Sequence, residues 1–273
     1  MSNTETPTIH TTAVVDPTAE IAESATIGPY CVIGVNVKIG SGTHLLNHVT
    51  VQCDTIIGCD NTIYPYSLIG GDPQDKKYHG ETTQLLIGDR NQIRENVTIH
   101  RGTEQGGGET VVGNDNLIMV GSHVAHDCIL ANNIVIANQV MLAGHITIED
   151  CATIGGGTGI NQFSRIGRCA YVGGLARITR DVPPFMIVEG SPAEVRAVNV
   201  VAMARRDYSE VEIDAVKEAF RRLFKENGGS QAKQMEEVLT DLGQHVPIQQ
   251  LCKAMTASSE GRHGRSNEKL TNA

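Results

Sequence analysis

The sequence predicts a mainly β protein, a three-sided parallel β solenoid built from six-residue repeats, followed by a small α-helical domain. Aliphatic residues recur at every sixth position over most of the chain, a period that fits neither an α-helix nor an alternating strand. Aromatic residues make up only 4% of the 273 residues, so the core must consist of small and β-branched side chains. The period stops after Pro183 and Pro184, and helical patterns follow.

The repeat consists of twenty-six hexads with Ile, Val or Leu in the first place. The second place is often Gly, the fifth is small or β-branched, and the fourth favours Asn, Asp and Gly, which tolerate left-handed backbone torsions. The first-place residues are Ile9, Val15, Ile21, Ile27, Ile33, Ile39, Leu45, Val51, Ile57, Ile63, Ile69, Ile87, Ile93, Ile99, Val112, Ile118, Val124, Leu130, Ile136, Leu142, Ile148, Ile154, Ile160, Ile166, Val172 and Ile178.

A period of six indicates short straight segments joined by tight corners, with the first-place side chain pointing inward. Three such segments close one triangular coil of about eighteen residues, and successive coils pair as parallel strands about 4.8 Å apart. Residues eighteen positions apart are therefore expected to be vertical neighbours on the resulting prism.

These patterns divide the chain into three parts. Residues 1–192 are expected to form the solenoid, with loops at 72–84 and 102–110 where polar segments interrupt the hexads; long loops in a compact solenoid are often functional. Residues 193–257 are expected to form a helical domain that caps the open end of the prism, where strand edges are otherwise unpaired. Residues 258–273 are polar and lack a pattern, so a disordered tail is expected.

Three helices are expected in the second part. Ser209 and Glu212 form a capping box before the first helix. Ser230 begins the second, which Gly243 ends, and the third runs from about Pro247 to Met255.

Composition excludes several classes of function. A net charge of −9 argues against nucleic acid as the main partner. No apolar run approaches the length of a membrane span, so stable membrane insertion is not expected. The seven cysteines include no CxxC pair, and the polar segment 1–7 does not resemble a signal peptide, which together favour a cytosolic protein with reduced thiols.

The predicted coil brings candidate catalytic residues together. His126, Gly144 and Gln162 are spaced by eighteen and form one column, and Asp127 and His145 lie in the adjacent column. This arrangement places an imidazole beside a glycine backbone and a second imidazole on one outer patch. It suits acyl transfer, in which a histidine removes a proton from a nucleophile and an N–H group holds the oxyanion.

Other interpretations of these residues remain open. His126 can be a solvated surface histidine. Asp127 can be at its corner only because aspartate tolerates the left-handed backbone torsion there, with no catalytic role. His123, His126 and His145 can instead bind zinc at a subunit boundary, although no carboxylate or cysteine completes a familiar ligand set. A catalytically silent scaffold solenoid is the alternative from another functional class.

Several motifs resemble one family. The hexads resemble the left-handed parallel β-helix acyltransferases, and the other motifs resemble the UDP-N-acetylglucosamine acyltransferases of lipid A biosynthesis. The resemblance covers about residues 8–255. The motifs are Ile-Gly-Asp-Arg-Asn-Gln-Ile-Arg-Glu-Asn-Val-Thr-Ile-His-Arg-Gly-Thr (87–103), Gln-Gly-Gly-Gly (105–108), His-Val-Ala-His-Asp-Cys (123–128), Leu-Ala-Gly-His (142–145), Asp-Val-Pro-Pro (181–184), Gln-Asp-Lys-Lys-Tyr (74–78) and Arg-Arg (205–206).

The resemblance implies a homotrimer with active sites in clefts between neighbouring prisms. It implies transfer of an (R)-3-hydroxyacyl group from acyl carrier protein to the 3-hydroxyl of UDP-N-acetylglucosamine, with no cofactor and no metal. In this interpretation His126 is the general base, Asp127 orients it, and the N–H of Gly144 stabilises the oxyanion.

Further residues match family positions in the substrate sites. Gly174 matches the position where side-chain size limits the acyl groove, so a long acyl chain is expected. Two positions depart from the family pattern: Asn161 replaces a frequent His, and Val201 an acidic residue near the ribose. The residues that match substrate-binding positions are Gln74, Asp75, Lys77, His123, His145, Gln162, Asn199, Arg205 and Arg206.

Other activities stay open beside this one. Some relatives acylate a 3-amino UDP-sugar, and the sequence does not distinguish the two acceptors. The N-acyltransferase of the same pathway has a further domain before its prism, and a γ-carbonic-anhydrase-like lyase would need zinc.

The acidic carrier protein requires a basic docking patch. Two clusters are candidates: Lys217, Arg221, Arg222 and Lys225, and Arg165, Arg168, Arg177 and Arg180.

Overall fold

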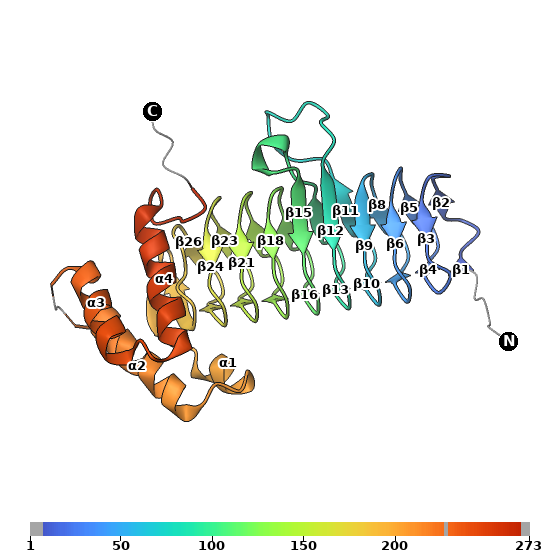
Figure 1. Cartoon of the computed structure of the whole chain (residues 1–273). Helices are drawn as coiled ribbons and strands as arrows, with labels where there is room; N and C mark the ends of the chain where they lie inside the picture. The colour runs from blue at the N-terminus through green and yellow to red at the C-terminus, as the bar shows by residue number, and fades with distance from the viewer. Residues whose placement is uncertain (1–7, 227–228, 269–273) are drawn as a thin grey trace.

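A computed structural model describes residues 8–226 and 229–268. It is a three-sided prism of stacked coils with a group of helices at its C-terminal end (Figure 1). This arrangement confirms the predicted parallel β solenoid with an α-helical C-terminal domain. No helix in the described part of the chain has the length and apolar character that a membrane span requires.

The three faces are sheets of eleven, nine and eight strands. The eleven-stranded sheet contains β1 (Thr8–Ile9), β4 (Thr26–Ile27), β7 (His44–Leu45), β10 (Thr62–Ile63), β13 (Gln92–Ile93), β16 (Leu117–Ile118), β19 (Val135–Ile136), β22 (Thr153–Ile154), β25 (Tyr171–Val172), β27 (Met186–Gly190) and β28 (Ala193–Val198). The nine-stranded sheet contains β2 (Val14–Val15), β5 (Val32–Ile33), β8 (Thr50–Val51), β11 (Leu68–Gly71), β14 (Thr98–His100), β17 (His123–Val124), β20 (Met141–Leu142), β23 (Gly159–Ile160) and β26 (Arg177–Ile178). The eight-stranded sheet contains β3 (Glu20–Ile21), β6 (Lys38–Ile39), β9 (Thr55–Ile57), β12 (Gln84–Ile87), β15 (Glu109–Val112), β18 (Ile129–Leu130), β21 (Thr147–Ile148) and β24 (Arg165–Ile166).

Strand register follows the hexads. In uninterrupted parts of the repeat, a first-place residue pairs with the one eighteen positions later, as Ile9 does with Ile27. The pairing skips over both interruptions, since Ile57 pairs with Ile87 and Ile87 with Val112. The two loops therefore project from the prism, and the strands before and after each loop still pair in register.

Both loops are slightly shorter than expected. The first covers residues 72–83, because β12 already begins at Gln84. The second covers residues 101–108 and contains the short 3-10 helix η1 (Glu104–Gly106), because β15 begins at Glu109. Gln84 and Glu109 pair in the ladder, which draws the ends of both loops into the sheet.

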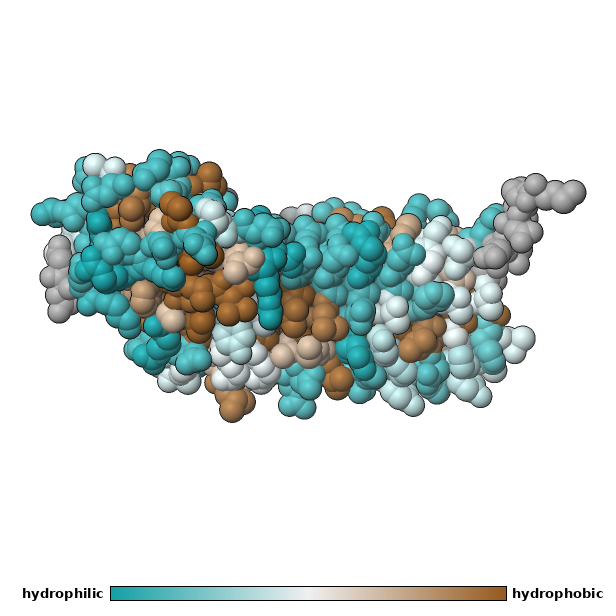
Figure 2. Space-filling view, turned by 90° about the horizontal axis from the view of Figure 1, so that it is seen from below, coloured by the Kyte–Doolittle hydropathy of each residue, from teal (hydrophilic) through white to brown (hydrophobic). Residues whose placement is uncertain are grey.

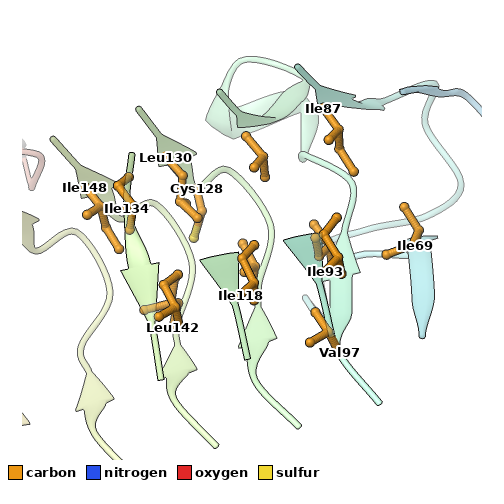
Figure 3. Packing of buried hydrophobic residues seen from close by; sticks show 14 of the residues in the cluster. Ile69, Ile87, Ile93, Val97, Ile118, Cys128, Leu130, Ile134, Leu142 and Ile148 are labelled. Carbon is orange, nitrogen blue, oxygen red and sulfur yellow. The ribbon is translucent and has the colours of Figure 1, made fainter. Parts of the chain in front are cut away.

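The core lies along the prism axis. First-place side chains from Ile27 onward are almost fully buried, and Figure 3 shows members of this cluster pointing into the space between the faces. Fifth-place residues such as Cys31 and Val37 fill the remaining volume. Close packing of short aliphatic side chains leaves no room for large aromatics, which explains the composition.

The corners use left-handed torsions at the fourth place, as expected. Asn36 has φ 57°, Asp54 has φ 51° and Asp127 has φ 61°. Larger residues also adopt this conformation, including His145 and Phe163, because packing on the neighbouring coil holds them there.

The sheet continues beyond the last hexad. β27 pairs in parallel with β25, and β28 then returns antiparallel to β27. The helices are α1 (Val200–Arg205), α2 (Glu210–Phe224), α3 (Gln231–Leu242) and α4 (Val246–Glu260). The helical part thus begins about seven residues later than expected, and α1 was not predicted.

Caps follow the sequence signals. Ser209 and Glu212 form the expected capping box, Ser230 caps α3 and Gly243 ends it. The helices pack on Phe185 and Met186 at the end of the prism through a second apolar cluster.

The prediction of a disordered tail is wrong for residues 258–268. Residues 258–260 belong to α4, and residues 261–268 fold back onto the last coils. Backbone and side-chain hydrogen bonds to Asp181 and Thr147 hold this polar segment, and polar contacts of this kind leave no hydrophobic pattern in the sequence. The last five residues of the expected tail, 269–273, lie outside the described residues.

Candidate active site

The predicted column of His126, Gly144 and Gln162 is present in the structure. The N–H of His145 donates to the carbonyl of His126 (3.0 Å), and the N–H of Phe163 donates to the carbonyl of Gly144 (3.1 Å). These bonds stack the 126–127, 144–145 and 162–163 corners on one edge of the prism. This edge, where the chain passes from the nine-stranded to the eight-stranded sheet, is called the catalytic edge below.

His126 and Asp127 form a tightly held pair. Nδ1 of His126 donates to Oδ2 of Asp127 over 2.6 Å. The two carboxylate oxygens also accept from the backbone N–H and the hydroxyl of Thr103, both at 2.7 Å. Burial would raise the pKa of Asp127, but the hydrogen bonds from His126 and Thr103 outweigh it and lower the pKa. Asp127 is therefore a carboxylate at neutral pH.

The carboxylate fixes the tautomer of His126. Because Nδ1 carries the proton shared with Asp127, the lone pair of a neutral imidazole lies on Nε2. Nε2 lies against Gly144 and has no hydrogen-bond partner among residues 8–226 and 229–268. It is the atom available to take a proton.

Two glycines make room for this pair. A Cβ at Gly144 would lie 2.5 Å from Cε1 of His126 and 2.9 Å from Nε2. A Cβ at Gly106 would overlap the carboxyl group of Asp127. Within the described residues the N–H of Gly144 donates to no acceptor, so it remains free to bind an oxyanion beside the imidazole.

The expectation of an open outer patch is wrong in one respect. His126 does point away from the core, but it is only 4% exposed and Asp127 is 6% exposed. The 101–108 loop folds over the pair through Thr103 and Gly106. Removal of water strengthens the electrostatic coupling between the imidazole and its carboxylate.

Two further histidines border the pair. His145 stacks on Phe163 (4.5 Å between ring centroids), and its Nε2 lies 3.5 Å from Oδ2 of Asp127. Burial lowers the pKa of His145, partly opposed by the Asp127 charge. His123 shares a 2.7 Å hydrogen bond with the hydroxyl of Thr98, and burial lowers its pKa to about 4.

A zinc site formed by His123, His126 and His145 is not assembled. In the described part of the chain, the side chains close enough to share a metal ion are those of His126, Asp127 and His145. His123 instead contacts the edge of His100. Both oxygens of Asp127 already accept hydrogen bonds, and a metal would have to displace them.

The 72–83 loop reaches the same edge. The charges of Asp75 and Lys77 both act on His145, and these two residues line a small hollow with Thr103. Gln74 is exposed on this loop. Gln162 is exposed one coil beyond Gly144. The chain thus brings Asp75 and Lys77 of the loop close to His145 at the catalytic edge.

Other expected residues lie on different edges. Asn199 caps α1 and donates to the carbonyl of Cys169, at the edge between the eight- and eleven-stranded sheets. Arg205 and Arg206 follow at the exposed end of α1. Gly174 lies at the third edge, between β25 and β26, and a Cβ there would make ordinary contacts with Gly156. One chain does not bring these residues to His126.

Sequence reasoning missed some residues that hold the site. Thr103 binds both carboxylate oxygens of Asp127, and Thr110 accepts from its backbone N–H over 2.8 Å. The interrupted hexads were the available signal, because they marked the segment that contains Thr103. Nothing in the pattern indicated which residue of that loop would face Asp127.

Comparisons with known proteins show which family the chain resembles. A family model described as UDP-N-acetylglucosamine O-acyltransferase, domain 2, matches residues 181–263. The Moraxella catarrhalis UDP-N-acetylglucosamine O-acyltransferase structure is 44% identical, with a TM-score of 0.87 over 90% of this chain and 95% of that one. Acinetobacter baumannii LpxA is 40% identical, with a TM-score of 0.86 over 90% and 95%. The Francisella novicida UDP-N-acetylglucosamine acyltransferase is 36% identical, with a TM-score of 0.87 over 97% and 98%.

The fold and the site define the class of protein first. The parallel β-helix and its similarity to solved acyltransferase structures make the chain a hexapeptide-repeat acyltransferase with a left-handed β-helix. Within this class, the chain belongs to the UDP-N-acetylglucosamine acyltransferase family. The family resemblance in the sequence is thereby confirmed.

Proposed function

We propose that this enzyme transfers an (R)-3-hydroxyacyl group from acyl carrier protein to the 3-hydroxyl of UDP-N-acetylglucosamine, the first step of lipid A assembly. The observation that carries the proposal is the His126–Asp127 pair, with a free N–H on the adjacent Gly144. Family membership supports the acceptor, and the geometry supports the chemistry.

His126 acts as the general base in this proposal. Its Nε2 takes the proton of the sugar hydroxyl while the oxygen attacks the thioester carbonyl. The carbonyl oxygen becomes an oxyanion that accepts from the N–H of Gly144. When the intermediate collapses, the new C–O bond is retained, the C–S bond breaks, and the proton on His126 passes to the departing thiolate.

Asp127 keeps His126 in the reactive tautomer. It accepts from Nδ1, and its negative charge stabilises the imidazolium that forms during proton transfer. Thr103 holds the carboxylate in place, so the 101–108 loop positions Asp127 and, through it, the general base His126.

A homotrimer would bring the remaining site residues together. Asn199, Arg205 and Gly174 lie on edges other than the catalytic edge, so a second copy of the chain must supply some of them. Figure 2 shows a face on which apolar residues gather near the helical domain, as expected for a surface that another copy covers. All seven cysteines are free thiols, in keeping with the proposed cytosolic location.

The decisive experiment combines one variant with product analysis. Purified protein is incubated with hydroxyacyl carrier-protein donors and either UDP-N-acetylglucosamine or its 3-amino analogue, and products are identified by mass spectrometry. We expect an ester on the first acceptor. His126→Ala should lower kcat by about 10²–10⁴-fold, the usual contribution of a general base, while circular dichroism shows that the prism remains folded. Near wild-type turnover in this variant, or an amide as the main product, would contradict the proposal.

Gly174 supports a long acyl chain. A Cβ at this position meets only the backbone of Gly156, at 3.4 Å or more, so the glycine leaves open space at its edge. Gly174→Met should shift donor preference toward shorter chains, as measured by kcat/KM across a series of acyl carrier-protein donors. Val14→Met, at an exposed position on an N-terminal coil, serves as a control, and equal effects of both substitutions would show that Gly174 does not limit the acyl groove.

A further inference from the structure

The C-terminal segment 261–268 is seated on the catalytic edge. The N–H of Asp181 donates to the carbonyl of Gly264 (2.7 Å), and the N–H of Ser266 donates to the Asp181 carboxylate (2.8 Å). Asn267 donates to the hydroxyl of Thr147 (2.9 Å) and to the carbonyl of His145 (3.3 Å). The segment thus runs from the end of the prism back to the backbone of a histidine in the active site.

This segment completes a basic hollow. His263 and Arg265 line it from the tail, while Asn161, Arg177 and Arg180 line it from the last coils. Within residues 8–226 and 229–268, no carboxylate forms an ion pair with Arg177, Arg180 or His263. Arg265 is paired with Glu268, so the unneutralised positive charge of the hollow comes from Arg177 and Arg180.

The hollow lies in line with the catalytic residues. Arg180 is eighteen positions after Gln162, so it continues the column that contains His126 and Gly144. Three strand spacings separate the levels of His126 and Arg180, which is about 14 Å. An extended substrate arm whose reactive carbonyl is at His126 can place an anionic group at this distance.

We propose that the tail is part of the substrate site and that His263, together with Arg177 and Arg180, binds the phosphate ester of the acyl donor. This inference rests on the proposed function. Imidazole and guanidinium groups donate charge-assisted hydrogen bonds to phosphate oxygens, and the hollow offers both kinds of donor.

The donor fits this position better than the nucleotide acceptor. The arginines assigned to the nucleotide, Arg205 and Arg206, are at the end of α1 and not in this hollow. The other basic groups are mostly neutralised. Salt bridges pair Arg165 with Glu149, Arg168 with Asp150, Lys217 with Asp214, Arg221 with Glu218 and Arg222 with Asp241.

The test measures KM for each substrate in His263→Ala. We expect a roughly three- to tenfold higher KM for the acyl carrier-protein donor, as for loss of one partly exposed charge-assisted contact, with kcat and the KM for the UDP-sugar unchanged. The matched control is Arg262→Ala, which removes a cation from the same segment but outside the hollow. This control should leave the donor KM near the wild-type value.

A second variant tests the seating of the segment. Asn267→Ala removes the contacts to Thr147 and His145 and should also raise the donor KM. An unchanged donor KM in His263→Ala, or a rise in the UDP-sugar KM instead, would overturn the inference while leaving the proposed reaction intact. Absence of acyl transfer in the wild-type enzyme would reject the proposed reaction itself.

Discussion

At the catalytic edge, a few ångströms of space decide which residue type an individual position tolerates. Gly144 and the other corner glycines look alike in the repeat, yet Gly144 is required for a specific reason, since a Cβ would meet the imidazole of His126. Gly106 is required because the carboxylate of Asp127 occupies the place of its side chain. Sequence reasoning identified His126, Asp127 and Gly144 from column spacing, but the contact with Gly106 depends on how a loop folds.

The buried histidines make stability depend on pH. Burial lowers the pKa values of His100, His123 and His145, that of His123 to about 4. An unfolded histidine has a pKa near 6.5, so between about pH 6.5 and 4 the unfolded chain binds more protons than the folded one. The free energy of unfolding should therefore fall as the pH decreases through this window.

Urea unfolding at pH 7 and at pH 5 measures this loss of stability. His123→Gln, which can still form a hydrogen bond with Thr98, should lose less stability than the wild type between the two pH values. Equal losses in both proteins would mean that His123 does not contribute to the pH dependence.

The hexad is the element that this chain repeats, and the same six positions take different roles along the prism. Fifth-place residues are mostly apolar, but Asn61, Asn91 and Asn116 form a buried ladder across the two ejected loops. Nδ2 of Asn91 donates to Oδ1 of Asn61 (2.9 Å) and to the carbonyl of Gly113 (2.9 Å). The ladder satisfies backbone groups where the loops interrupt regular coil geometry.

Removal of the central amide should therefore be costly. Asn91→Ala leaves the N–H of Asn116 and the carbonyl of Gly113 without this partner, and each unpaired buried group typically costs about 1–3 kcal/mol. Thermal or urea unfolding measures the loss. Lys38→Ala, which breaks only an exposed salt bridge to Glu20, should change stability by less than about 1 kcal/mol. A similar small effect of both substitutions would show that the ladder is not a source of stability.

At the scale of the whole molecule, the three edges of the prism divide the expected site among them. His126 lies on the catalytic edge, Asn199 at a second edge and Gly174 at the third. A convex prism does not bring its own edges together, so a site that needs all three must form between copies. The apolar face in Figure 2 supports such an assembly.

Mixed oligomers test whether sites are shared. His126→Ala and Arg205→Ala should each be nearly inactive alone. When the two are co-expressed, random assembly of a closed trimer should restore roughly one quarter of the sites, if each site takes one residue from each neighbour. Absence of recovery in purified mixed trimers would place both residues in the same chain's site. The His126→Ala and Asp127→Asn pair is the control, because both residues lie on one chain and no recovery is expected.

The sequence alone determined the winding of this protein, because an inward aliphatic side chain every six residues has one efficient way to be buried. That winding placed His126 next to Gly144, and capping residues marked the starts of α2 and α3. Only the tertiary structure decided that Thr103 donates hydrogen bonds to Asp127 and that His126 is buried. It also decided that the polar segment after Glu260 returns to the catalytic edge. These features depend on hydrogen bonds between residues far apart in the chain, and such bonds have no period to detect.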